Sequence, residues 1–452
     1  MNKTKLFSLL VLCCTLVSGV WAQGQSGDKI LPYPIQQKKL ANGLNVVTVP
    51  FNSPGLAAFY IVVRAGSREE VEPGKTGFAH FFEHMMFRGT EKYNTKEYEA
   101  VLKSIGASAN ANTSTDRTVY HMTGNADMLE KMFEMEGDRF QNLKYSVHDF
   151  KTEAGAVKGE YTKNSASPYS QLNELVYSTA FKKHTYSHTT MGFFKDVVDM
   201  PNQYEYSKVF FNRFYRPEYA TIVVVGDVKQ EEVNRLAQKY FGNWKRGNYQ
   251  PKIETEAPQK ETRFAHVKQA GFPPYLMLGY KGPAFSDKSK ELPALDLMTS
   301  ILFAPTSELY KKLVLQEQKV RFVGGGPSFS RDPNLISVSA SVVKAEDLQY
   351  VKDEIVKAIE EMKTKPVDAQ KLADTKSNNR YSFAMGMDSP DAIANSLARF
   401  IWLNGDPESI NRIYALYDQV TPQDIMAVAK KYFVNTGLTI ATISPNDQGG
   451  VK

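Results

Sequence analysis

Apolar and polar residues alternate along this chain in two different rhythms. Short runs rich in apolar and β-branched residues, at 57–63, 118–124 and 221–227, predict β-strands. Longer stretches with apolar residues three or four positions apart, at 128–142 and 230–241, predict amphipathic helices. Because both kinds of element occur along the whole length, the pattern predicts an α+β fold.

The predicted elements also repeat in order. Residues 118–140 give a strand, a turn and an amphipathic helix, and residues 336–362 have the same layout. Residues 208–227 match residues 427–447 as a helix ending in aromatic residues, a turn and a β-branched strand. These matches predict two homologous domains of about 200 residues each.

A polar stretch separates the two predicted domains. Residues 247–264 are rich in charged and polar residues and include two prolines, a composition typical of a linker. We therefore predict an N-terminal domain at 23–247, a linker at 248–262 and a C-terminal domain at 263–452.

The first 22 residues have the pattern of a secretory signal peptide. A basic start is followed by an apolar stretch too short for a comfortable membrane span, and small residues stand at Val20 and Ala22. We expect cleavage after Ala22 and a periplasmic or secreted protein, with an N-terminal anchor helix as the alternative.

Both cysteines, Cys13 and Cys14, lie inside this apolar stretch, so the mature chain is expected to be stable without disulfides. Cleavage removes two lysines and no acid, which takes the net charge from +6 to +4. A charge this small predicts no nucleic-acid partner and no attraction to acidic membranes. No later apolar run approaches membrane-spanning length, so we expect a soluble mature protein.

The stretch HFFEH, His80 to His84, is the main candidate for chemistry. By chance it would occur in about one chain per hundred of this composition. On a helix, His80, Glu83 and His84 fall on one face, opposite the neighbouring Phe and Met side chains. Two imidazoles one turn apart suit a divalent metal such as zinc, and the carboxylate beside them suits a general base. The alternative is a histidine pair at an ordinary helix surface.

A second acidic pair follows later in the chain. Glu153 and Glu160 are seven residues apart and would share one face of a helix. Spacing alone favours two solvated surface acids.

The chain resembles the pitrilysin (insulinase) family of zinc peptidases. The resemblance rests on residues 62–93, around the inverted H-x-x-E-H, and on residues 105–122, 153–161 and 220–228, which follow in the order of the family's motifs. It implies two homologous α/β-sandwich domains, each an antiparallel-rich sheet covered by helices.

The same resemblance implies the role of each site residue. The ligands of one Zn²⁺ per chain would be His80, His84 and Glu160. Glu83 would be the general base, and Glu153 an accessory acid that orients the site. Asn110, Ala111, Asn112 and Thr113 match the family's substrate-binding edge strand, which pairs with the backbone of an extended peptide.

One departure from the family's pattern concerns the groups that hold the substrate carbonyl. Self-sufficient members carry an Arg and a Tyr seven residues apart in a non-catalytic half, where this chain has Val314 and Arg321. The chain therefore resembles the zinc-binding partner of a two-component enzyme. We expect a heterodimer with a homologous metal-free chain, or a homodimer.

The complete ligand set favours a periplasmic zinc-dependent metalloendopeptidase that hydrolyses peptides or unfolded segments. The alternative is a non-catalytic structural or peptide-binding subunit of a larger complex, because the family also contains chains without the metal residues.

Overall fold

A computed structural model describes residues 29–445 and residue 451. The predicted signal peptide, residues 1–22, lies outside the described residues. Within them, no helix is both long enough and apolar enough to cross a membrane.

The N-terminal half is built on a six-stranded mixed sheet with the order β1-β2-β6-β3-β5-β4. Its strands are antiparallel to their neighbours except for the parallel pair β2 and β6. The strands are β1 (Gln36–Lys39), β2 (Asn45–Pro50), β3 (Leu56–Val63), β4 (Ser108–Thr113), β5 (Thr118–Asn125) and β6 (Ala220–Gly226). The helices of this half are α1 (Phe78–Met85), α2 (Thr95–Ser104), α3 (Leu129–Asn142), α4 (Val147–Asn164), α5 (Pro168–Ala180), α6 (Phe194–Asp199), α7 (Tyr204–Phe214) and α8 (Gln230–Phe241).

The C-terminal half has a five-stranded sheet with the order β7-β11-β8-β10-β9, in which only β7 and β11 are parallel. Its strands are β7 (Arg263–Lys268), β8 (Tyr275–Lys281), β9 (Val320–Pro327), β10 (Leu335–Val342) and β11 (Leu438–Ser444). Its helices are α9 (Glu291–Phe303), α10 (Glu308–Tyr310), α11 (Leu348–Thr364), α12 (Ala369–Met385), α13 (Pro390–Asn404), α14 (Ser409–Asp418) and α15 (Pro422–Tyr432).

The repeat predicted from the sequence is present in both sheets. Strand β5 leads into α3 as β10 leads into α11, and α7 leads into β6 as α15 leads into β11. The strand order is the same in both halves once β1 is set aside. The prediction of two homologous α+β domains is therefore confirmed.

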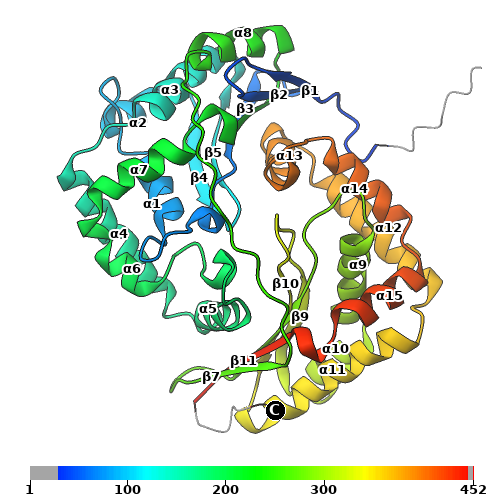
Figure 1. Ribbon diagram of the computed structural model, residues 1–452. Coiled ribbons are helices and arrows are strands. Elements are labelled where there is room, and N and C mark those ends of the chain that lie inside the picture. The colour runs from blue at the N-terminus through cyan, green and yellow to red at the C-terminus, as the bar shows by residue number, and fades with distance from the viewer. Residues whose placement is uncertain (1–28, 446–450, 452) are drawn as a thin grey trace, which may run out of the picture.

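Each sheet is covered on one face by a helix of the other half (Figure 1). Helix α13 packs on β3 and β6 of the N-terminal sheet, where Leu397 and Ile401 share a buried cluster with Tyr60 and Val223. Helix α5 packs on β7, β8 and β11 of the C-terminal sheet. The two halves are therefore interlocked by an exchange of helices.

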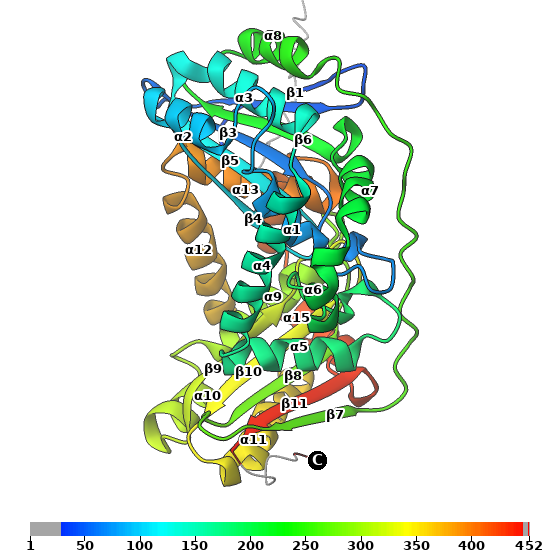
Figure 2. The same ribbon diagram turned by 90° about the vertical axis from the view of Figure 1, so that its left-hand side faces the viewer.

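The chain passes from one half to the other along the surface (Figure 2, right-hand edge). Residues 244–260 contain no helix or strand, and the predicted linker, 248–262, begins within this stretch and ends just before β7.

Candidate metal centre

Helix α1 carries the HFFEH stretch and has two different faces. Phe78, Phe81 and Phe82 are fully buried in the core of the N-terminal half. Each buried aromatic side chain contributes about 1.5–3 kcal/mol of hydrophobic stabilisation, and the hydroxyl of Tyr120 donates a 3.0 Å hydrogen bond to the Phe82 carbonyl. The apolar face thus fixes the helix and leaves His80, Glu83 and His84 on the other face.

Helix α4 packs against α1 and supplies the acids of the site. It begins with a capping box between Ser146 and Asp149, and its buried face includes Glu153. One oxygen of Glu160, Oε2, lies 3.5 Å from His80 Nε2 and 3.4 Å from His84 Nε2. The structure thus brings together three side chains that are up to 80 residues apart in the sequence.

The three donor groups fit a zinc ion. Each offers one nitrogen or oxygen atom, and these atoms lie within 4.8 Å of one another. Donors bound tetrahedrally at 2.0–2.1 Å would be separated by about 3.4 Å, which agrees with both distances from Glu160. Two imidazoles and one carboxylate also form a common donor set of catalytic zinc sites, which keep a further position for water.

Glu153 fixes the orientation of the second histidine. Its Oε1 lies 2.8 Å from His84 Nδ1, and its other oxygen accepts a hydrogen bond from Arg88. Nδ1 donates to this carboxylate, so Nε2 is left with a free lone pair directed toward Glu160. The sequence reasoning missed Arg88, which lies three residues beyond the end of α1 at Met85.

The charges of these groups follow from burial and from their neighbours. Burial, and next the nearby His84, lower the pKa of His80, which keeps its imidazole neutral and able to bind a metal. The hydrogen bond with Glu153 raises the pKa of His84. Burial raises the pKa of Glu153, but the hydrogen bonds from His84 and Arg88 outweigh it and hold the value below the usual range.

Glu83 differs from the other acids of the site. It is partly exposed and has no hydrogen bond or ion pair with any residue that the structure describes. Its carboxylate is therefore free to accept a proton from a molecule held beside the two histidines.

The four residues predicted to bind substrate lie on β4, which forms one edge of the N-terminal sheet and contacts α1. The outer side of β4 has no neighbouring strand among the described residues. The backbone N–H of Ala111 bonds to the Asn110 side chain at 2.9 Å. An extended peptide could add to this edge as a further strand.

The two positions that depart from the family's pattern lie in the C-terminal half. Val314 is in a π-helical turn (Lys311–Gln316) against the core of this half, and Arg321 is exposed on β9.

Two family models match the chain. Residues 50–192 match the model described as Insulinase (Peptidase family M16), and residues 203–379 match the model described as Peptidase M16 inactive domain.

Known proteins that cover nearly the whole chain include zinc protease PqqE of Helicobacter pylori, which is 29% identical over 90% of this chain and 92% of its own length. A solved structure of a protease from Helicobacter pylori superposes with a TM-score of 0.85 at 28% identity, covering 91% of this chain and 100% of that chain. The first half of the periplasmic protease PqqL from Escherichia coli superposes with a TM-score of 0.72, covering 92% of each chain. At 18% identity, this last match shows the fold alone.

Proposed function

The chain belongs to the insulinase (M16) family of peptidases, and on this premise we propose that it is a zinc-dependent peptidase that hydrolyses peptides or unfolded segments of proteins. The observation that carries the proposal is the convergence of His80, His84 and Glu160, with the free carboxylate of Glu83 on the same face of α1.

In this proposal, His80, His84 and Glu160 hold one zinc ion. A zinc ion held there would polarise the scissile carbonyl and would lower the pKa of a water molecule to about 7. Glu83 accepts a proton from this water molecule while the oxygen of the water attacks the scissile carbonyl carbon. When the C–N bond breaks, Glu83 passes that proton to the leaving amine.

The surrounding residues would orient these groups. Glu153, held by Arg88, keeps the Nε2 atom of His84 directed toward Glu160. The edge of β4 from Asn110 to Thr113 would align the peptide through backbone hydrogen bonds, which gives little dependence on substrate side chains.

We also propose that a homologous metal-free chain completes the site, because Val314 and Arg321 stand where an Arg and Tyr pair is expected. Donors that stabilise a developing oxyanion are worth about 10²–10³ in rate each. The purified chain alone should therefore hydrolyse a mixed peptide library at least that much more slowly than the chain mixed with its candidate partner. Equal rates with and without the second chain would contradict this part of the proposal.

The predicted signal peptide supports a periplasmic location as a further proposal. N-terminal sequencing of the chain recovered from the periplasm would then begin at Gln23. Recovery of the chain with residues 1–22 still attached would contradict it.

The alternative of a non-catalytic subunit has weaker support. The match to a model described as inactive covers residues 203–379, whereas the three donor groups lie before residue 192. That match begins within the N-terminal half but contains none of the three donor groups, so it leaves the candidate site untouched.

A further inference from the structure

The start of the metal-site helix has an unusual cap. Helix α1 begins after Gly77, which has no side chain to accept the first backbone N–H groups and which adopts a φ of +93°. A Cβ at this position would lie 3.0 Å from the Met191 carbonyl oxygen, so a larger residue does not fit without strain. The residues that usually cap a helix with their own side chain, Ser, Thr, Asp and Asn, are therefore excluded at this position.

Glu70 supplies the missing cap from outside the helix. Its Oε2 accepts a 2.8 Å hydrogen bond from the Gly77 N–H, and its Oε1 accepts one of 2.8 Å from the Ala79 N–H. The residue is only 3% exposed. A carboxylate at a helix N-terminus is favourable, and two bonds to two different N–H groups fix both the position and the rotation of the helix start. His80 follows Ala79 directly.

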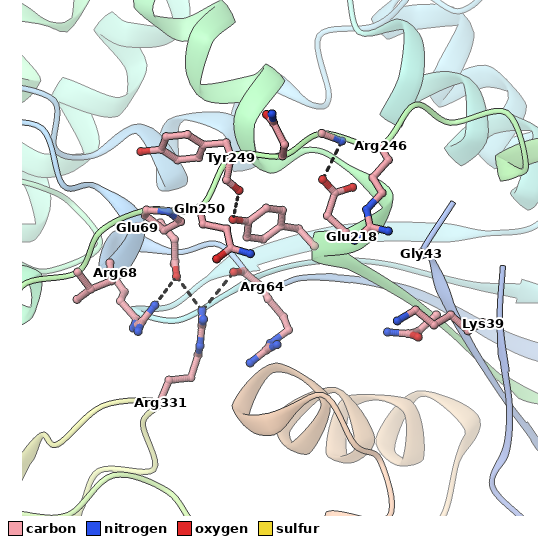
Figure 3. Close-up of a pocket in the computed structure, with 16 residues that line it drawn as sticks. Lys39, Gly43, Arg64, Arg68, Glu69, Glu218, Arg246, Tyr249, Gln250 and Arg331 are labelled. Atoms are coloured by element: carbon pink, nitrogen blue, oxygen red, sulfur yellow. Dashed lines mark hydrogen bonds and ion pairs between the residues drawn. The ribbon is translucent and has the colours of Figure 1, made fainter. Parts of the chain in front are cut away.

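The preceding residue, Glu69, is bound by the C-terminal half. Its Oε1 accepts a 2.7 Å hydrogen bond from Arg331 Nη1 and a 2.9 Å bond from Arg68 Nη1, and the side chain is 1% exposed. Figure 3 shows Arg68 and Arg331 converging on Glu69 at the wall of a cavity of about 610 Å³. This cavity is lined by none of the candidate metal ligands.

Further contacts hold the loop between β9 and β10, which carries Arg331. The backbone N–H of Arg331 donates to Asp116 Oδ2 at 2.9 Å, and Arg68 Nε donates to Asp332 Oδ2 at 2.6 Å. We call this set, Arg68, Glu69, Asp116, Arg331 and Asp332, the interdomain clasp.

We propose that Glu70 is a positioning residue for the metal-site helix, and that the interdomain clasp holds it in place through Glu69. Adjacent residues of one short segment thus connect Arg331 of the C-terminal half to the start of α1. The C-terminal half thereby sets the geometry of a site to which it contributes none of the three candidate ligands. The functional meaning of this link rests on the proposed zinc site.

The cost of disturbing the clasp has a physical cause. Removing Arg331 leaves the buried carboxylate of Glu69 with Arg68 as its remaining cationic partner, and loss of one partner of a buried ion pair is strongly destabilising. The segment 66–70 is expected to shift to restore solvation, and Glu70 would shift with it.

The first test replaces Glu70 with glutamine. The amide keeps one acceptor but turns an NH₂ group toward a backbone N–H of α1, so one bond is lost. We expect zinc affinity to fall about 10–100-fold, as for other residues that orient ligands, and the visible spectrum of the cobalt-substituted chain to change. In the metal-free chain, amide hydrogen exchange should accelerate at residues 77–86 and stay unchanged in β3 and β6. Glu91→Gln, at a 75% exposed side chain, is the matched control.

The second test uses Arg331→Gln, alone and with Glu70→Gln. We expect faster amide hydrogen exchange at residues 77–86 in Arg331→Gln. The double variant should bind zinc no more weakly than whichever of the two single variants binds it more weakly. Wild-type exchange and zinc affinity in both single variants would overturn the proposal, as would exchange that rises equally across both sheets. Multiplied losses in the double variant would overturn the link to the clasp. If Glu70→Gln does not fold, Arg331→Gln alone decides. Failure of the wild-type chain to hydrolyse peptides would refute the proposed function and leave these readouts valid.

Discussion

Replacing Glu83 with glutamine is expected to lower kcat for peptide hydrolysis by about 10²–10⁴, the range that general acid–base catalysis contributes. The amide has nearly the same shape as the carboxylate but cannot accept a proton from water. Because Glu83 has no hydrogen bond or ion pair with the described residues, the substitution breaks none in the fold. Zinc content should therefore stay at the wild-type level, and the loss should appear in kcat.

The matched control is Glu99→Gln on the exposed side of α2, which should leave both kcat and zinc content unchanged. Unchanged hydrolysis by Glu83→Gln would refute the assignment of Glu83 as the general base. Loss of zinc from this variant would instead assign Glu83 to the ligand set.

Replacing Glu160 with glutamine is expected to remove zinc binding and activity together. The side chain places an oxygen 3.4–3.5 Å from both imidazole Nε2 atoms, and an uncharged amide is a much poorer zinc ligand. Zinc affinity, measured by competition with a chelator of known affinity, should fall by far more than the roughly 10–100-fold expected when an orienting residue is changed.

Glu153→Gln is the comparison that gives this prediction its meaning. It leaves all three donor groups in place and weakens the bonds of this side chain to His84 and Arg88. Its loss of zinc affinity should therefore lie within about 10–100-fold. If Glu153→Gln loses zinc as completely as Glu160→Gln, the assignment of Glu160 as a metal ligand and of Glu153 as an orienting residue is contradicted.

Local periodicity was sufficient for the parts of the fold that depend on nearby residues. Helix α1 and its two faces follow from the 3.6-residue period of the Phe and Met side chains. The strand and helix repeats follow in the same way, because each homologous half repeats the same order of elements.

Long-range packing could not be read from the same patterns. The apolar face of α5 shows that the helix must be buried, but not that it packs on the sheet of the other half. The position of Glu160 could not be predicted either, because its spacing from Glu153 indicates only that the two acids share one face of a helix. Its placement beside His80 depends on how α4 packs against α1, and the family resemblance alone pointed to it.

Glu70 was missed for a related reason. An acid seven residues before the N-cap of a helix has no local signature, since the usual capping pattern places an acceptor at the N-cap itself. The glycine at that N-cap was the available signal, because it left the first N–H groups of α1 in need of another acceptor.

Peptide hydrolysis by this chain is proposed to depend on a single zinc ion held by His80, His84 and Glu160. The decisive experiment is to add zinc stepwise to the metal-free chain, in the presence of its candidate partner, and to follow hydrolysis of a mixed peptide library. The rate should rise in proportion to added zinc, level off at one zinc per chain and return to the background after chelation. Hydrolysis that is the same with and without zinc, or absent at every zinc level, would contradict the proposed zinc mechanism.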